Sequence, residues 1–214
     1  MHKDQNKRLE RTKKRLQRIL MAVDYRRKQR LKYPLADFVC LMPYMAKESV
    51  AQLAKIEPPA KFCKRDVPKD LQGVSFGVLT RLQQAPDQKD IVKTWCNLVS
   101  VLTDVPAEKV RWCKAVEVLG IVNMIQKEME RIGKLFQSLQ TEHSSDELQA
   151  GIDKLNFGAF GLVDWYAKRM GIVDHEEVFA TPWARIWQCM RIDHENNEFE
   201  KRYRNIIQRG IKKK

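Results

Sequence analysis

The sequence predicts an all-α protein. Apolar residues recur every three or four positions in nearly every segment, which is the period of a helix. Prolines and glycines mark most segment boundaries, and N-terminal capping signals precede the later segments. At 214 residues, of which 43% are hydrophobic, the chain is large enough to bury a core. We expect a helical bundle body with a long basic N-terminal helix and a long C-terminal helix.

Residues 3–32 are expected to form an exposed helix covered with charge. Pro34 ends this helix, because the residue before a proline is driven out of the α region. The sequence then divides into a basic helical arm (1–33), short helices with a Pro-rich linker (34–72), and a helical body ending in a basic helix (73–214). The apolar stripe of the arm is narrow and consists of Leu9, Leu16, Leu20, Val23 and Leu31.

The first half of the body contains three predicted helices. Helical periodicity begins at Phe76 and stops before Pro86. A second periodic run extends from 87 to 102. Pro106 suits the first turn of a third helix, because its missing N–H would be unpaired there anyway, and the apolar period then continues almost to Leu139.

The second half of the body contains two further predicted helices. Ser144–Glu147 has the form of a capping box, so a helix is expected to begin there and to continue to Met170. Gly171 suits the left-handed position that ends such a helix. The final helix is expected to begin at Pro182 and to extend to about Gln208.

The positive charge lies at the two ends of the chain. Residues 1–32 carry 13 Lys/Arg against 3 acidic residues, and 201–214 carry 7 against none, so the segment 33–200 has a net charge of −4 within a total of +13. Such ends are typical of a solvated arm, a nucleic-acid contact or a contact with an acidic protein. The candidate contacts are Arg11, Lys14, Arg15, Arg18, Arg26, Arg27, Arg30, Arg202 and Arg204.

The sequence contains no motif that indicates an enzyme. GxSxG, GxxxxGK[ST] and a GxGxxG after a strand are all absent, and the histidines lack the HExxH spacing of a zinc site. The five cysteines are never closer than 17 positions, which predicts reduced thiols and a cytoplasmic protein. We expect no catalytic residue, no metal, no cofactor and no membrane span.

Aromatic residues and glycines are densest between 157 and 187. Gly158 and Gly161 share a helix face, which indicates close helix packing; the alternative is a GxxG loop that clamps a nucleic-acid backbone. The run 164–169 is either a partner surface or a helix end whose cations complement the dipole. The residues predicted to bind a partner are Trp165, Arg169, Trp183 and Trp187.

This part of the chain also resembles a known family. The run Phe157–Ile172, followed by Asp174–Val178 and Pro182–Trp183, resembles helical prophage proteins and is similar to tail assembly chaperones of long-tailed bacteriophages. The segment Ser75–Ile132 resembles the small helical N-terminal part of such chaperones. The resemblance covers about half of the chain and implies an all-helical protein without an active site, which coats the tape-measure protein during tail assembly.

The basic ends depart from the pattern of that family. We therefore keep three expectations for the function. The first is a non-enzymatic phage morphogenesis protein that binds another polypeptide, such as a tape-measure protein, in the host cytoplasm. The second is a nucleic-acid-binding accessory that uses the basic ends. The third is a structural component of the virion, in a connector or tail.

Overall fold

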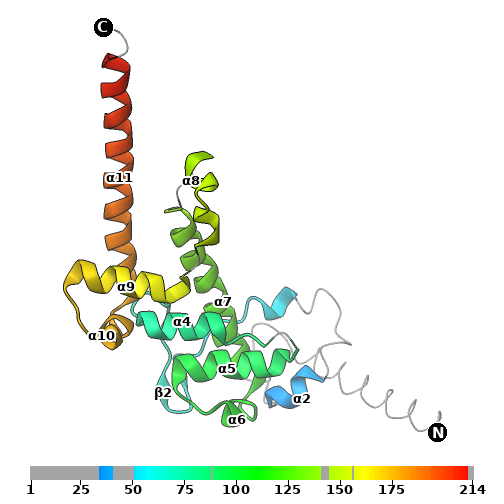
Figure 1. Cartoon of the computed structure of the whole chain (residues 1–214). Coiled ribbons are helices and arrows are strands. Elements are labelled where there is room, and N and C mark those ends of the chain that lie inside the picture. Colours follow the sequence, from blue (N-terminus) through cyan, green and yellow to red (C-terminus); the bar gives the residue numbers. More distant parts are fainter. Residues whose placement is uncertain (1–33, 41–50, 88, 141–144, 156, 212–214) are drawn as a thin grey trace. The chain divides into compact units, whose positions relative to one another are not determined.

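Most of the described chain is helical. The computed structural model describes residues 34–40, 51–87, 89–140, 145–155 and 157–211, and within these ranges helices predominate over two short strands (Figure 1). The all-α expectation is confirmed. The bundle stays a prediction, and so does the basic N-terminal helix, since residues 1–33 lie outside the described ranges.

The elements follow one another along the chain as labelled in Figure 1. They are α2 (Leu35–Val39), β1 (Lys61–Phe62), β2 (Arg65–Asp66), α4 (Phe76–Gln84), α5 (Ile91–Thr103), α6 (Ala107–Val110), α7 (Ala115–Gln137), α8 (Ser145–Gln149), a 3-10 turn (Ile152–Lys154), α9 (Gly158–Met170), α10 (His175–Ala180) and α11 (Trp183–Ile211).

The predicted helix 106–139 is two helices, α6 and α7. In a continuous helix, the carbonyls of Arg111 and Cys113 would accept hydrogen bonds from N–H groups one turn later. They instead accept hydrogen bonds from the backbone N–H groups of Ala36 (3.2 Å) and Leu35 (3.0 Å) at the start of α2. The break at 111–114 therefore follows from a contact with a distant part of the chain.

The predicted helix from 144 to 170 is also interrupted. Gly151 has a φ of 84°, and this left-handed conformation separates α8 from the 3-10 turn that follows. The end of the predicted helix is confirmed, because Gly171 caps α9 with a φ of 67°. The long C-terminal helix is also confirmed, with its start directly after Pro182.

The chain forms two compact units. The described residues of 34–71 and 81–129 make up unit 1, and 72–80 with 130–211 make up unit 2. The predicted body 73–214 thus contributes residues to both units. In unit 1 the core contains buried side chains from α2, the β1–β2 hairpin, α4, α5, α6 and α7; among them are Leu35, Phe38, Phe62, Leu82, Val99, Val110, Val118, Ile121 and Ile125.

The β1–β2 hairpin lies in the stretch predicted to be a Pro-rich linker. Cys63 and Lys64 form its two-residue turn with φ values of 49° and 69°, a conformation that usually selects Gly or Asn. Phe62 is only 1% exposed, so the hairpin is anchored in the core of unit 1. The Sγ atoms of Cys63 and Cys113 lie 3.5 Å apart as free thiols, and burial raises the pKa of Cys113 to about 12.

A close approach to α7 fixes the segment before this hairpin. A Cβ atom built on Gly120 would lie 2.3 Å from the carbonyl oxygen of Glu57, so only a glycine fits there. One turn later, the Asn123 amide donates hydrogen bonds to the carbonyl oxygens of Leu53 (2.7 Å) and Ile56 (3.2 Å). These two α7 residues together hold the chain around 53–58 against the helix.

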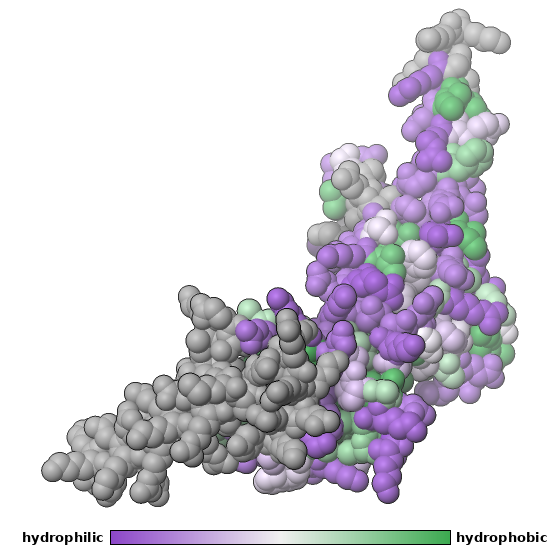
Figure 2. Space-filling view, turned by 180° about the vertical axis from the view of Figure 1, so that it is seen from behind, coloured by the Kyte–Doolittle hydropathy of each residue, from purple (hydrophilic) through white to green (hydrophobic). Residues whose placement is uncertain are grey.

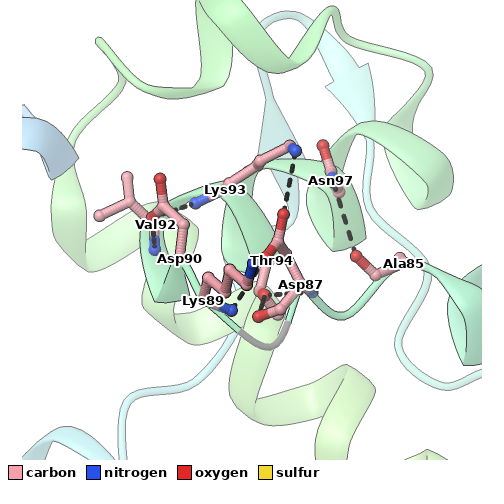
Figure 3. A network of polar contacts seen from close by, with 8 residues as sticks. All are labelled: Ala85, Asp87, Lys89, Asp90, Val92, Lys93, Thr94 and Asn97. Atoms are coloured by element: carbon pink, nitrogen blue, oxygen red, sulfur yellow. Dashed lines mark hydrogen bonds and ion pairs between the residues drawn. The ribbon is translucent and has the colours of Figure 1, made fainter.

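A polar network fixes the turn that leads into α5 (Figure 3). The Asp90 carboxylate caps the helix by accepting hydrogen bonds from the backbone N–H groups of Val92 (2.9 Å) and Lys93 (3.0 Å). The Lys93 ammonium also forms an ion pair with Asp87 at 2.9 Å. The pKa of Asp87 is lowered by the backbone N–H of Lys89 and then by Lys93, so this carboxyl is ionised at neutral pH.

Unit 2 is built around the start of α11. The backbone N–H of Phe76 donates to the carbonyl oxygen of Thr181 at 2.8 Å, and the rings of Phe76 and Phe179 stack at 6.2 Å. Trp183 is 2% exposed, and Ile186, three residues later on the same side of α11, is fully buried. The α9 residues Val163, Tyr166 and Ala167 are also buried in this unit.

Candidate functional site

An open groove between α9 and α11 is the candidate site of unit 2. Its volume is about 390 Å³. On the α9 side, Leu162 and Trp165 are apolar, and Gly161 leaves a gap because it has no side chain. On the α11 side, Met190 contributes a thioether and the other three residues contribute polar groups. The lining residues are Leu139, Gly161, Leu162, Trp165, Met190, Asp193, His194 and Asn197.

The α11 side of the groove follows from helical spacing. Met190, Asp193, His194 and Asn197 recur at three, one and three positions, so their side chains lie on one face of the helix. The same face carries Ile186 one turn before Met190 and Trp183 two turns before it, where the helix enters the core. The groove is therefore the outward continuation of the surface that packs α11 into unit 2.

The α9 side depends on glycine. A Cβ atom on Gly161 would lie 2.6 Å from the Cβ of Phe157, so the helix needs a glycine there to accommodate its own first turn. Gly158 has a φ of 54° and open space around it. Among the described residues, the atoms nearest to a Cβ on Gly161 all belong to Phe157, and a Cβ on Gly158 would meet nothing within 4 Å, so neither glycine makes room for a neighbouring helix. The prediction of close helix packing is therefore wrong, and both residues lie in a helix rather than in a GxxG loop.

Charged groups lock one edge of the groove. Arg169 of α9 forms an ion pair with Asp193 of α11, and its guanidinium lies 5.8 Å from the centre of the Trp165 ring. Lys168 pairs with Asp164 at 2.7 Å, four residues earlier on the same helix. The Trp165 ring is thus held in place at a half-exposed position without being covered.

Two of the four predicted partner-binding residues meet at this groove. Trp165 lines it, and Arg169 contacts both Trp165 and Asp193. The prediction for Trp183 is wrong, since its ring is 2% exposed and lies 6.1 Å from the ring of Phe136 in the core. Large aromatic rings in helical periods serve cores as often as surfaces.

Trp187 is half-buried and already has internal partners. Its indole Nε1 donates a hydrogen bond to the carbonyl oxygen of Leu135 at 3.0 Å, and the Arg191 guanidinium lies 5.4 Å from the ring centre. This tryptophan therefore ties α11 to the end of α7 within unit 2. It does not line the groove.

Most residues of the groove were not predicted from the sequence. Helical spacing could have identified five of them, because it places them beside Trp165 or on the outward continuation of the core face; they are Leu162, Met190, Asp193, His194 and Asn197. Leu139 had none, since it follows the end of α7 and reaches the groove only through the tertiary fold.

The basic candidates fall into two groups. Arg202 and Arg204 are exposed on α11, where Arg204 forms an ion pair with Glu200 at 2.9 Å. The others lie outside the described residues; they are Arg11, Lys14, Arg15, Arg18, Arg26, Arg27 and Arg30.

The groove combines apolar, sulfur-containing and polar side chains. Across the described residues, no three His, Cys, Asp or Glu side chains come together as a metal site would require. Among the same residues, no helix combines the length and the apolar character needed to cross a membrane. A half-exposed indole, a thioether and fixed polar groups are what a polypeptide surface needs to receive an apolar side chain.

Comparisons with known proteins add no family. No protein-family model, curated protein or solved structure matches this chain. The resemblance to tail assembly chaperones therefore stays a prediction that rests on the residues quoted above.

Proposed function

We propose that this protein is a non-enzymatic adaptor that binds another polypeptide in the α9–α11 groove. The observation that carries the proposal is Trp165, a half-buried ring that lines an open groove and is held by Arg169 and the Arg169–Asp193 ion pair. Tryptophan, arginine and methionine are enriched at the energetic centres of interfaces. A ring that is already fixed loses little conformational entropy when a partner covers it.

The size of the groove limits what it accepts. At about 390 Å³, with Leu162 and Met190 as apolar walls, it suits one or two apolar side chains of a partner rather than a whole domain. An amphipathic helix presents such side chains at three- and four-residue spacing. The partner we propose is therefore a helical segment that places apolar anchors in the groove and polar residues near His194 and Asn197.

A tail assembly chaperone is the specific form of this function that we propose. A tape-measure protein is a long helical chain, and it would offer such segments repeatedly. The resemblance described above supports this assignment, and the basic ends distinguish the protein from a pure chaperone. A structural role in the virion is the alternative form, and mass spectrometry of purified particles separates the two, because a chaperone is missing from the finished particle.

Trp165→Ala tests the groove. We expect the affinity for helical segments of the cognate tape-measure protein to fall about 30-fold, as for a central interface tryptophan. The measurement is isothermal titration calorimetry with the full chain. Trp112→Ala is the matched control, because Trp112 is 67% exposed and belongs to unit 1, whose residues do not line the groove, and it should change the affinity less than about threefold. Equal affinities of wild type and Trp165→Ala would contradict the proposed site.

A nucleic-acid-binding accessory is the second candidate function. It is favoured by one observation: no acidic residue follows Glu200, while Arg202 and Arg204 are exposed on α11. Binding that rests on phosphate contacts should weaken at least about tenfold between about 50 and 200 mM salt. Arg202→Ala/Arg204→Ala should reduce that salt dependence, whereas Arg81→Ala/Arg111→Ala, at exposed positions of unit 1, should not. Fluorescence anisotropy with labelled DNA and RNA is the measurement, and absence of binding at low salt excludes this function.

A further inference from the structure

The α11 helix has two apolar faces. The first contains Trp183, Ile186 and Met190, and it packs into unit 2 and lines the groove. The second lies further along the helix and is exposed, as the green side chains along α11 in Figure 2 show. We call this second face the α11 stripe; its residues are Ile192 (48% exposed), Phe199 (60%), Tyr203 (56%) and Ile206 (67%).

Helical geometry places the stripe on the side of α11 that faces away from the groove. Its residues follow one another at seven, four and three positions, so they occupy an arc of roughly 60° at 100° per residue. Met190 and Asn197 of the groove lie about 180° from the middle of that arc. The face that packs α11 into unit 2 therefore cannot also bury the stripe. The rings of Phe199 and Tyr203 stack on each other at 6.2 Å and form its centre.

The charge along this part of α11 changes sign. Four acidic residues come first and four basic residues follow, which are Asp193, Glu195, Glu198 and Glu200, then Lys201, Arg202, Arg204 and Arg209. Glu195, Glu198, Arg202 and Arg209 all lie along the same flank of the stripe at 100° per residue. Arg191 lies on that flank directly before Ile192 and pairs with Glu195 at 3.5 Å, and Glu198 pairs with Lys201 at 3.1 Å, all at exposed or half-exposed positions. The stripe thus has an acidic end and a basic end on one edge.

We propose that the α11 stripe binds the same stripe of a second copy of this chain, with the two helices antiparallel. An antiparallel pair places Glu195 and Glu198 of one copy opposite Arg202 and Arg209 of the other, and the reverse at the other end. A parallel pair would place the acidic turns beside each other and the basic turns beside each other, which is repulsive.

The charge pattern also argues against another occupant from this chain. The N-terminal segment 1–32 has a heptad-like spacing at Leu9, Leu16 and Val23, but it carries a net charge of +10. It would lie against the seven basic residues of 201–214 at one end of the stripe. A second copy in antiparallel orientation avoids that repulsion and matches charges at both ends.

The stripe spans about two heptads, so the pairing is weak. Coiled coils that are recognisable on their own sustain three or four heptads. We expect a dissociation constant of about 1–100 µM, in the range of transient association. The two faces of α11 are independent, so a failure of this proposal leaves the groove proposal unaffected.

Sedimentation velocity of the full chain, from about 1 to 500 µM, tests the pairing. We expect the mass to move from 25.2 kDa towards twice that value as the concentration rises. Phe199→Glu/Ile206→Glu should stay monomeric throughout. Leu155→Glu/Val173→Glu is the matched control, since both residues are exposed apolar positions of unit 2 outside α11, and it should behave as wild type. A monomer at every concentration, or a stripe variant that dimerises like wild type, overturns the proposal.

A charge reversal tests the orientation. Glu195→Lys/Glu198→Lys makes the whole flank basic, so it should weaken an antiparallel pair at least about tenfold. In a parallel pair it would only exchange the repulsion between acidic turns for a repulsion between basic turns, so the affinity would change little. Adding Arg202→Glu/Arg209→Glu should restore the dimer, because the two ends are complementary again. An unchanged or higher affinity after the first pair of substitutions, or no restoration by the second, overturns the antiparallel arrangement. Circular dichroism of each variant confirms that α11 remains helical.

Discussion

Replacing Gly120 by alanine should lower the free energy of unfolding by about 2 kcal/mol, although alanine favours helices by about 1 kcal/mol. The added Cβ would lie 2.3 Å from the Glu57 carbonyl oxygen and 2.7 Å from the carbonyl carbon. Both are backbone atoms, so no side-chain rotation relieves the overlap. The segment 53–58 must move away from α7, and the hydrogen bonds from Asn123 to Leu53 and Ile56 would lengthen or break.

The same helix contains its own control. A Cβ atom on Gly133 of α7 meets nothing within 4 Å. Gly133→Ala should therefore raise the free energy of unfolding by about 0.5–1 kcal/mol, because only the backbone entropy of the unfolded chain changes. Urea unfolding followed by circular dichroism measures both variants. Equal effects of the two substitutions would contradict the close approach at Gly120.

Helical periodicity predicted the elements well where local signals decide them. The periodic stretches from 76 and from 87 correspond to α4 (Phe76–Gln84) and α5 (Ile91–Thr103), and Gly171 ends α9 as its left-handed preference predicts. The start predicted at 87 is four residues early, because Asp90 caps α5. The break between α6 and α7 was not predictable in this way, because it depends on the N–H groups of Leu35 and Ala36, which lie more than 70 residues earlier in the sequence. The close approach at Gly120 could not be predicted either, because a glycine in a periodic run does not show which backbone segment packs against it.

The β1–β2 hairpin was not predicted, for a different reason. Its turn is Cys63-Lys64, and neither residue type favours the positive φ that the turn requires. Burial of Phe62 offsets that local cost, and burial is a property of the whole unit. Local sequence therefore pointed to a linker where the tertiary fold forms a packed hairpin.

The sequence identified the aromatic region that contains the candidate site, but not which of its tryptophans are exposed. Composition alone could not assign Trp165, Trp183 and Trp187 to the surface or to the core. That distribution depends on which face of α11 is buried. Trp183 and Ile186 are buried, and Met190 continues their face along α11. The apolar period of α11 therefore assigns Trp183 to the interior only once it is known that this face packs against the rest of unit 2.

Replacing Trp183 by alanine should lower the free energy of unfolding by about 3–5 kcal/mol, as for other buried large aromatic residues. The indole is 2% exposed, lies 6.1 Å from the Phe136 ring and has the Arg131 guanidinium 6.0 Å from its centre. Its removal leaves a cavity at the start of α11, and it takes away one of the contacts that join α11 to the last turns of α7, another being the Trp187–Leu135 hydrogen bond. Thermal and urea unfolding measure the loss.

Trp165→Ala separates the two roles of tryptophan in unit 2. Because Trp165 is half-buried at the edge of the groove, its truncation should cost less than about 1.5 kcal/mol of stability while it lowers the affinity for a helical partner about 30-fold. Trp183→Ala should show the reverse order, a large loss of stability and a loss of binding only through unfolding of the groove. If Trp183→Ala were as stable as Trp165→Ala, the ring at 183 would not be part of the core, and the assignment of the inner and outer faces of α11 would have to be exchanged.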